Sequence, residues 1–297
     1  MERSAARPAL SSRPPTHIGM KGPTLLTVIS ANVNGIRAAQ RRGGVKWLSA
    51  GDAHIICLQE VRANDGQLTA ALADSPLADL HVAHAPSDKA GRAGVAVLSV
   101  REPLEVRVGL GEFEADGRWI EADFRDGDGL LTVVSAYTHT GEADTPKQAE
   151  KYRFMDAMHV RMDQLAGRAA HGMGEALITG DLNVAHREVD IKNWKGNLGR
   201  AGFLEGERAY FDRWLGDDNR RGTWVDLGRK HGGPGPGPYT WWTWRGQAFD
   251  NDTGWRIDYQ LATRGLAARS VDAQVGRAAS YADRWSDHAP LTVTYSA

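Results

Sequence analysis

The chain has 297 residues, of which 41% are hydrophobic and 25% charged, values typical of a globular protein with a sizeable core. No apolar run approaches the roughly 20 residues that a membrane-spanning helix needs, so a membrane protein is excluded. The formal net charge is −1, so the chain lacks the overall positive charge of many nucleic-acid-binding proteins. Any phosphate-binding surface therefore has to be local.

The chain begins with a segment rich in Arg, Ser and Pro that has no apolar core of a signal peptide. We expect residues 1–22 to be a disordered tail and residues 23–297 to form a single domain. The single cysteine, Cys57, excludes an internal disulfide and lies within an apolar run, so we predict that it is a core residue in a reducing compartment.

Short apolar runs bounded by Gly, Asp or Pro recur along the chain and predict buried or half-buried strands. In chain order they cover residues 25–30, 54–59, 94–100, 119–124, 130–137, 176–180, 256–262 and 291–295. Short helices are predicted after Gly43, after Gly66 and over residues 209–215. Because strands dominate and helices are interspersed, we predict two packed sheets with helices outside them.

The clearest helix is predicted over residues 145–168, with Thr145 as its cap and Pro146 at its first position. Its predicted apolar face is formed by Ala149, Tyr152, Met155, Met158, Met162 and Leu165. We interpret the methionines as core residues. The Gly- and Pro-rich residues 232–238 are predicted to form a surface loop, after which a strand-like pattern resumes.

Polar side chains follow several of the predicted strands, at the positions where active sites on sheet scaffolds are usually assembled. Asn32 and Asn34 are two positions apart, so their amides face the same side, although Asn-x-Asn-Gly is also ordinary turn chemistry. Glu60 directly follows the second predicted strand. A carboxylate there is costly unless it is exposed, bound to a metal or paired with Arg62.

The most specific pattern is Gly-Asp-Leu-Asn at residues 180–183, directly beyond a buried strand. Gly180 allows a close approach of another segment. Asp181 can act as a general base on water, and Asn183 can bind a phosphate oxygen.

Asp258 lies inside the predicted strand 256–262, where a buried carboxylate needs a partner. The partner that we predict is His288, which follows Asp287 just before the last strand. Pairing with Asp258 would orient the imidazole and keep it protonated beside an anionic phosphate.

Together these motifs resemble the exonuclease III family of abasic-site endonucleases, within the endonuclease/exonuclease/phosphatase superfamily. The matching motifs, in order, are SANVNG, LQE, SAY, GDLN, GWRIDY and SDHAP. Residues 183–203 are similar to the abasic-endonuclease branch in particular. The resemblance implies an α/β fold: a four-layered α/β sandwich of two mainly antiparallel sheets flanked by helices, like that of DNase I.

The resemblance also implies a Mg²⁺ site, with Mn²⁺ as a substitute ion, in which Glu60 is the main ligand. The other positions at this metal site are Asn32, Asn34, Asp181, Asn183, Asp287 and His288. The metal, an imidazolium and amide donors can stabilise the charge that builds up during attack on a phosphodiester.

Catalytic roles are implied for five positions. Asp181 would deprotonate the attacking water or assist the leaving group, and Asn183 would orient the water. His288, held by Asp258, would bind the scissile phosphate. Tyr137 would contact the same phosphate or stabilise the leaving oxygen.

For DNA binding, the resemblance implies an apolar pocket that accepts a flipped-out abasic sugar, with walls formed by Trp241, Trp255 and Ile257. Trp242 is instead expected to pack against a sheet. Two groups of mainly basic residues could contact the DNA backbone; the alternative is that each group is a solvated face. The first group is Arg37, Arg41, Arg42 and Lys46, and the second is Lys192, Lys195, Asn197 and Arg200.

The implied function is a DNA repair nuclease that cuts 5′ to abasic sites, with 3′-phosphodiesterase and 3′→5′ exonuclease activity. Its partner would be double-stranded DNA with abasic sites or 3′-blocked ends. We expect a monomer in the bacterial cytoplasm, associated with the nucleoid through DNA. The alternatives are a phosphohydrolase for phosphoinositides or sphingomyelin, and an inactive DNA-binding relative. Glu142, in the loop after Tyr137, departs from the family pattern and would repel phosphate.

Overall fold

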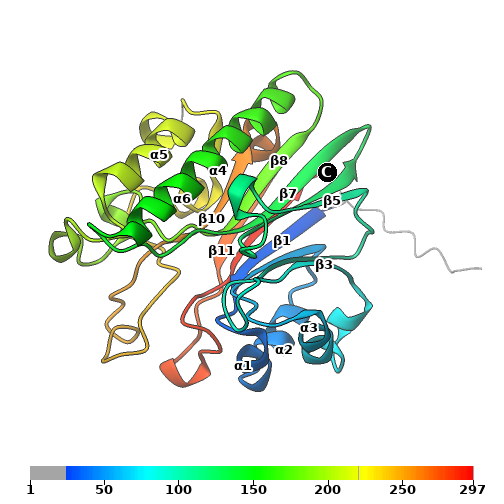
Figure 1. The fold of residues 1–297 in the computed structure, drawn as a ribbon, viewed down its shortest axis with the longest axis horizontal. Helices are drawn as coiled ribbons and strands as arrows, with labels where there is room; N and C mark the ends of the chain where they lie inside the picture. Colours follow the sequence, from blue (N-terminus) through cyan, green and yellow to red (C-terminus); the bar gives the residue numbers. More distant parts are fainter. Residues whose placement is uncertain (1–24, 220, 297) are drawn as a thin grey trace, which may run out of the picture.

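The computed structural model describes residues 25–219 and 221–296, so the predicted tail at residues 1–22 lies outside the described part. Two six-stranded sheets pack face to face, with helices on their outer faces (Figure 1). Sheet A has the strand order β11-β12-β1-β2-β4-β3, and sheet B has the order β5-β6-β7-β8-β10-β9. The α/β four-layered sandwich predicted from the sequence is confirmed.

The strands of sheet A are β1 (Leu25–Asn32), β2 (Ile55–Gln59), β3 (His81–Ala85), β4 (Val95–Ser99), β11 (Ser270–Val275) and β12 (Leu291–Ser296). Those of sheet B are β5 (Glu105–Val108), β6 (Trp119–Asp126), β7 (Gly129–Tyr137), β8 (Glu175–Asp181), β9 (Trp224–Asp226) and β10 (Asp258–Thr263). In each sheet the only parallel neighbours are the central pair, β1 with β2 and β7 with β8. All other neighbours are antiparallel.

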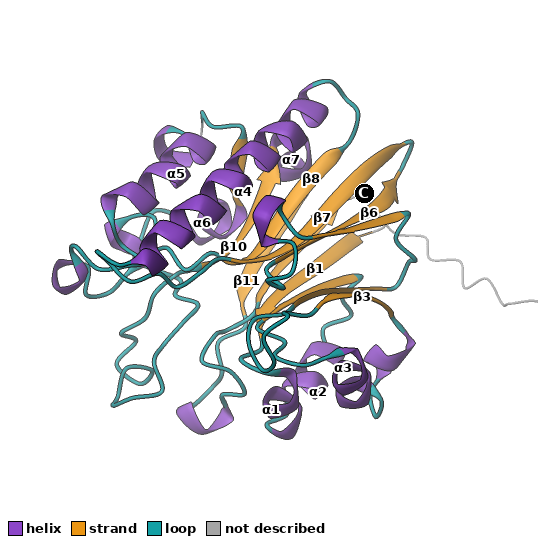
Figure 2. Ribbon diagram, viewed as in Figure 1, coloured by secondary structure: helices purple, strands orange, loops and turns teal. Residues whose placement is uncertain are grey.

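Helices cover both outer faces, as Figure 2 shows. The outer face of sheet A packs against α1 (Ile36–Arg41), α2 (Gly44–Ser49) and α3 (Asp65–Leu72). That of sheet B packs against α4 (Pro146–Ala170) and α5 (Glu205–Leu215). Two further short helices are α6 (Leu227–Gly232) and α7 (Arg264–Arg269). A third cluster of aliphatic and aromatic side chains fills the space between the sheets.

Buried glutamines connect the two sheets through this apolar layer. Gln59 of sheet A donates a hydrogen bond to the Ser135 hydroxyl of sheet B, at 3.0 Å. Gln260 of sheet B donates to the backbone oxygens of Val28 and Leu291 in sheet A, at 3.1 and 2.9 Å. Because a buried amide without a partner is unfavourable, these bonds fix how one sheet lies over the other.

Three details differ from the sequence-based expectations. No regular strand begins directly after residues 232–238, where Trp241 makes only isolated bridges to Trp255 and His288. Trp242 is buried as predicted, but it packs in a loop cluster with Tyr239 and Phe249 rather than against a sheet. Gly232 belongs to the end of α6 and not to the loop.

The buried face of α4 agrees with the prediction at Met155, Met158, Met162 and Leu165 but differs in the first turns of the helix. Ala149 is exposed, whereas Gln148, Lys151 and Phe154 are buried along with the methionines. A buried ion pair between Lys151 and Glu207 of α5 accounts for the difference, because it brings a charged residue to the packed face. Among the described helices, none combines the length and the apolar character that crossing a membrane requires.

Candidate active site

The candidate site lies at one end of the sandwich, where the central strands of both sheets end. Asn32 is the last residue of β1, and Glu60 follows β2. Tyr137 and Asp181 end the parallel strands β7 and β8 and are register partners. Asp258 begins β10 directly opposite Asp181. Packing of the two sheets thus brings together side chains that are far apart in sequence.

The backbone turns sharply just beyond these strands. Asn34, Glu60 and Asn183 have φ values of 45°, 50° and 49°, a left-handed conformation that is uncommon outside glycine. Such a conformation costs free energy and is concentrated at functional sites, where the surrounding structure holds it in place. The turns place Glu60 beside Asn32, Asn183 beside Asp181, and Asn34 beside Asp287.

Asn32 connects the two carboxylates of the site. Its amide nitrogen donates to Glu60 Oε1 and to Asp181 Oδ2, at 2.9 Å in each case. The other oxygen of Glu60 accepts a hydrogen bond from Arg62, so the pairing that the sequence left open is formed. Glu60 and Asp181 are both buried, and Asn32 separates their negative charges with a shared donor.

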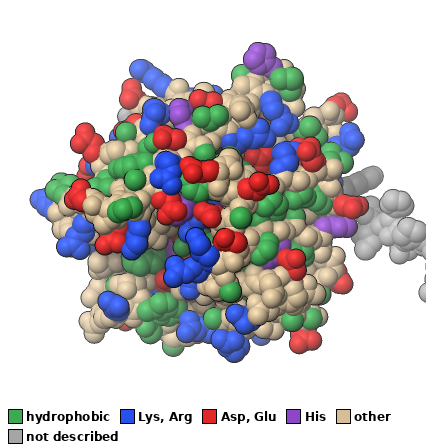
Figure 3. All heavy atoms as spheres, viewed as in Figure 1, with side chains coloured by type: hydrophobic (Ala, Val, Ile, Leu, Met, Phe, Trp, Pro, Cys, Tyr) green, Lys and Arg blue, Asp and Glu red, His purple; other side chains and the backbone are tan. Residues whose placement is uncertain are grey.

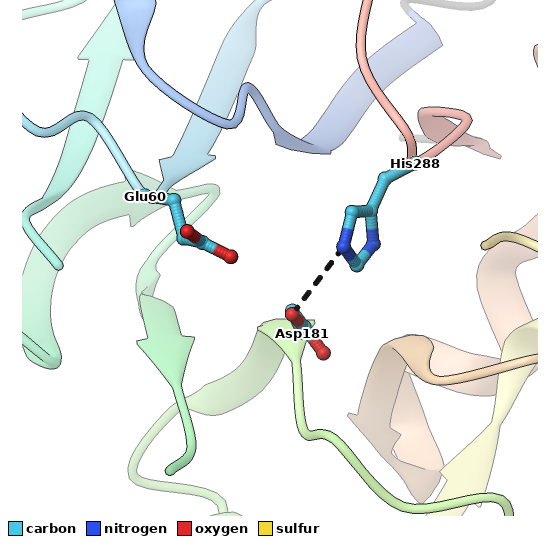
Figure 4. Close-up of side chains that lie close together, drawn as sticks. All are labelled: Glu60, Asp181 and His288. Carbon is cyan, nitrogen blue, oxygen red and sulfur yellow. Dashed lines mark ion pairs between the residues drawn. The ribbon is translucent and has the colours of Figure 1, made fainter. Parts of the chain in front are cut away.

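His288 lies between the carboxylates of Asp181 and Asp258. Figure 4 shows its contact with Asp181. Its Nδ1 is 2.8 Å from Asp258 Oδ2, which confirms the predicted pairing, and its Nε2 is 3.7 Å from Asp181 Oδ2. Burial opposes protonation, but Asp258 and Asp181 outweigh it and raise the pKa of His288 to about 10. Burial raises the pKa of Asp181 to about 7, opposed by the His288 cation and reinforced by Asp258 and Glu60.

Asn183 is held by contacts that its sequence motif does not reveal. Its amide nitrogen donates to the Thr138 backbone oxygen at 2.9 Å, and its backbone N–H donates to Asp181 Oδ1 at 2.9 Å. Its carbonyl accepts from Lys151 Nζ at 2.8 Å. Lys151 in turn pairs with Glu207 at 2.6 Å, both fully buried. These two residues were missed because their pairing joins two helices and leaves no sequence pattern.

Tyr137 is buried beside Glu60. Burial raises the pKa of its hydroxyl well above the usual value, and the negative charges of Glu60 and Asp181 add to the increase. The Arg118 guanidinium lies 4.7 Å from the centre of the ring and donates to the Tyr137 backbone oxygen at 3.2 Å. The phenol therefore remains protonated and can donate a hydrogen bond to an anion.

Glu60, Asp181 and His288 offer ligand atoms that all lie within 4.8 Å of one another. Carboxylates with nearby amide oxygens suit hard cations such as Mg²⁺ or Mn²⁺, so the residues present fit a divalent ion. Asp287 is not part of this cluster. Its carboxylate accepts hydrogen bonds from Asn34 Nδ2 at 2.6 Å and from Trp241 Nε1 at 3.2 Å. A metal role for Asn34 and Asp287 stays a prediction.

An apolar surface adjoins the polar cluster. Trp241 and Trp255 meet edge to face with ring centres 6.1 Å apart, and both pack with Ile257 in one cluster. The three predicted pocket walls are therefore neighbours. Trp194 and Phe203 belong to the same cluster and were not predicted from the sequence. Their position within residues 183–203, which resemble the abasic-endonuclease branch, was the available signal.

The predicted DNA-binding groups lie at the surface. Arg37 and Arg200 are exposed and Asn197 is half-buried. None of the Lys or Arg residues of the two groups has an ion-pair partner among the described residues, so their charges are available to phosphate. Arg42 stacks over Trp244, at 5.0 Å from its centre. Glu142 pairs with Lys147 at 2.7 Å, which offsets its negative charge.

Comparison with known proteins decides the family. The family model described as "Endonuclease/Exonuclease/phosphatase family" matches residues 29–288. The chain belongs to the endonuclease/exonuclease/phosphatase family. It is 34% identical over 273 residues to an exodeoxyribonuclease of Bacillus subtilis, covering 90% of this chain and 98% of that protein. It therefore falls in the exonuclease III and abasic-endonuclease branch of this family.

Two further family members support this placement. The DNA repair nuclease APEX1 of Danio rerio is 31% identical, covering 90% of this chain and 81% of that protein. The structure of an AP endonuclease from Archaeoglobus fulgidus superposes with a TM-score of 0.74 at 27% identity, covering 91% of this chain and 99% of that chain. The fold is thus that of endonuclease/exonuclease/phosphatase enzymes of this branch.

Proposed function

We propose that the protein is a metal-dependent DNA repair nuclease that hydrolyses the phosphodiester 5′ to an abasic site. The same site would carry 3′-phosphodiesterase and 3′→5′ exonuclease activity. One observation carries the proposal: the buried cluster of Glu60, Asp181 and His288 directly adjoins the apolar surface of Trp241 and Trp255. The buried cluster would then carry out the phosphodiester chemistry, and the neighbouring apolar surface would recognise the base-free sugar.

Each residue of the cluster has a role in this proposal. Asp181 accepts the proton of the attacking water, and Asn183 orients that water. His288, protonated by its contact with Asp258, donates to a non-bridging oxygen of the scissile phosphate. Tyr137 donates to the same phosphate or to the leaving oxygen.

The proposed ion is Mg²⁺, with Mn²⁺ as a substitute, held by Glu60 and Asp181 with Asn32, Asn34, Asn183 and Asp287 around it. His288 lies beside the ion as a hydrogen-bond donor to the phosphate, because its protonated ring has no free lone pair for the metal. When bound, it would neutralise charge on the phosphate and make bound water more acidic. Asn32 keeps Glu60 and Asp181 at a fixed separation through its two 2.9 Å hydrogen bonds. Arg62 limits the movement of Glu60 from the other side.

Substrate selectivity in this proposal comes from the apolar surface. Trp241, Trp255 and Ile257 would enclose the flipped-out sugar, while a complete nucleotide would not fit. Gly202 lies against Trp255, and a Cβ at that position would come within 3.0 Å of the indole. The Trp255 ring is therefore packed closely against the backbone of Gly202. Arg37, Asn197 and Arg200 would contact the backbone of the duplex, which the protein would bind as a monomer at the nucleoid.

The test is incision of an end-labelled duplex that carries one tetrahydrofuran abasic analogue, with Mg²⁺ and with EDTA. We expect one metal-dependent nick 5′ to the analogue. Asp181→Asn and His288→Ala should each lower the rate by roughly 10³-fold, because each removes a group that acts on the reacting atoms.

Exposed residues of the same type serve as controls. Asp74→Asn and His81→Ala should keep wild-type rates, since both side chains are exposed and distant in sequence from every motif. Wild-type rates in the Asp181 and His288 variants would refute the assignment. Turnover of sphingomyelin or a phosphoinositide, with no action on the abasic duplex, would favour the alternative substrate class.

A further inference from the structure

A second group of potential metal ligands lies outside the catalytic cluster. It consists of Asp116 before β6, His139 after β7 and Glu150 on α4, and one ligand atom of each lies within 4.8 Å of the other two. The three residues come from separate segments, so the fold brings them together. They line a cavity of about 460 Å³.

The imidazole of His139 points into this group and is not held by hydrogen bonds. Only 10% of its side chain is exposed, and its Nδ1 is buried with no hydrogen-bond partner among the described residues. The other ring nitrogen, Nε2, is 3.8 Å from Asp116 Oδ2 and 3.9 Å from Glu150 Oε1, beyond hydrogen-bond distance. Nε2 is therefore the atom that faces the two carboxylates and is available to a further ligand.

The separations suit an ion placed between the three groups. They are too long for hydrogen bonds. They are shorter than ~4.2 Å, the separation of two ligands on opposite sides of one ion with metal–ligand distances of ~2.1 Å. One ion can therefore contact the imidazole and both carboxylates after small side-chain movements.

The states of the three ligand groups themselves suit a metal ion. Burial, together with Arg118 and Lys151, lowers the pKa of His139 to about 3, so the imidazole is neutral and its lone pair is available. Asp116 and Glu150 have no Lys or Arg ion-pair partner among the described residues. Four cations line the same cavity. Arg118 stacks on Tyr137 and Lys147 pairs with Glu142, whereas Lys89 and Arg92 have no ion-pair partner among the described residues and oppose cation binding there.

We propose that Asp116, His139 and Glu150 bind one divalent transition-metal ion of the Zn²⁺ or Mn²⁺ class. An imidazole with two carboxylates suits these ions better than Mg²⁺, which prefers oxygen ligands and water. The ion ties the loop after β7 to α4 and to the segment before β6.

The bound ion also neutralises two carboxylates near Tyr137, where they would otherwise repel a phosphate. This consequence rests on the proposed nuclease function, whereas metal binding itself does not. The ion should lower the KM for abasic duplex and leave kcat unchanged, because none of its ligands touches the reacting atoms.

The experiment is a Zn²⁺ titration by calorimetry without DNA, in a Glu60→Gln background that weakens the catalytic metal site. We expect one ion per chain and binding that weakens at least tenfold when Glu150→Gln or His139→Phe is added. Glu150 is half-buried with no Lys or Arg partner among the described residues, and a Phe at position 139 would pack against Phe113 and Phe154, so both variants should fold. Asp163→Asn, an exposed acid on the same helix, should bind as the background does.

Nitrogen NMR of the imidazole identifies the ligand atom. Saturation with Zn²⁺ should shift the Nε2 resonance of His139 and leave that of His81 unchanged. Equal affinity in the background and in both added variants would overturn the proposal, as would a His139 resonance that does not respond to Zn²⁺. Since no DNA is present, this result is independent of the incision assay.

Discussion

The protonation states of Asp181 and His288 determine the role that each residue can have in the reaction. Both side chains are buried, and their nearest atoms are 3.7 Å apart, so the charge of one depends on the other. The second carboxylate, Asp258, contacts His288 from the opposite side at 2.8 Å. Two carboxylates around one imidazole favour the imidazolium, which leaves Asp181 as the group able to accept a proton.

We therefore predict that Asp258→Asn lowers the pKa of His288 by about 1 to 3 units, the usual effect of removing an adjacent opposite charge. The measurement is a nitrogen NMR titration of the imidazole in metal-free protein. In the wild type the ring should remain protonated beyond pH 8, because its pKa is raised to about 10. Asp163→Asn should leave the titration unchanged, and an unchanged midpoint in Asp258→Asn would contradict the interpretation.

The raised pKa has a consequence for stability as well. Protonated His288 stabilises the fold fully below the unfolded-state pKa of 6.5, and this contribution is lost as pH rises toward about 10. In metal-free protein, alkaline pH should therefore lower the stability of the wild type more than that of His288→Gln. Chemical denaturation at neutral and at alkaline pH measures this difference.

At the scale of single elements, the approach of β7 to β8 depends on Gly180. Its φ is 135°, and a Cβ would lie 1.9 Å from the Ala136 backbone oxygen. Since neither backbone can move without breaking the parallel pair, we predict that Gly180→Ala lowers the free energy of unfolding by roughly 3 kcal/mol or more. Urea denaturation provides the measurement.

A Gly→Ala substitution elsewhere in the chain is expected to raise the free energy of unfolding instead. Gly167 lies within α4, and a Cβ there would have no neighbour within 4 Å. Gly167→Ala should therefore stabilise the protein by up to about 1 kcal/mol, the difference in helix propensity. A similar loss in both variants would mean that Gly180 has no special structural role.

The strands that could be predicted from sequence are the central ones. All eight predicted strands exist, with boundaries shifted by at most two residues, because strands buried on both faces give continuous apolar runs. The four strands that were not predicted, β3, β5, β9 and β11, are the four sheet edges. Edge strands are short and half exposed, so sequences such as EVRV and HVAHA have no clear pattern.

The site residues, too, could be predicted only where a clear sequence pattern marks their position. Asn32, Glu60, Asp181 and Asn183 were predictable because each stands at the end of a central strand, and strand ends are visible in sequence. Arg118, Lys151 and His139 were not, because their partners belong to other elements. Which side chains meet across helices and loops depends on packing that no local pattern contains.

At the scale of the whole molecule, a buried network joins the loop after β8 to β9 and to the segment before β10. Arg256 contacts Asp190 at 2.7 Å and Asp226 at 2.8 Å, and Arg229 also binds Asp190. Burial opposes ionisation of Asp190, but Arg256 and Arg229 outweigh it and lower its pKa from 3.8 to about 2. Each partner compensates the others' loss of hydration.

A lowered pKa makes this contribution sensitive to acid. The stabilisation by the Asp190 carboxylate is fully present above pH 3.8 and is lost as pH falls toward 2. The free energy of unfolding should fall by about 2 kcal/mol over this range. Asp190→Asn cannot titrate, so the stability difference between wild type and variant should narrow over this range in chemical denaturation. For the exposed Asp79→Asn the difference should stay constant. A constant difference for Asp190→Asn would mean that its carboxylate is not coupled to folding.

Acidic and basic side chains are interspersed over the surface, as Figure 3 shows for one face, in agreement with the net charge of −1. DNA binding must therefore rely on a few local cations. Lys192 and Lys195 are exposed, lack ion-pair partners among the described residues and adjoin Trp194 of the apolar cluster. If both contact phosphates, each contributes about 0.9 to the slope of log affinity against log salt.

Replacing both lysines by glutamine should thus reduce that slope by about 1.8 and weaken binding most at low salt. Fluorescence anisotropy with an abasic duplex in EDTA measures binding without cleavage. Arg125→Gln provides the control, because Arg125 is exposed near the end of β6 opposite to the site. An unchanged slope in the double variant would make Lys192 and Lys195 a solvated face, and the DNA backbone would then have to follow Arg37 and its neighbours on α1 and α2.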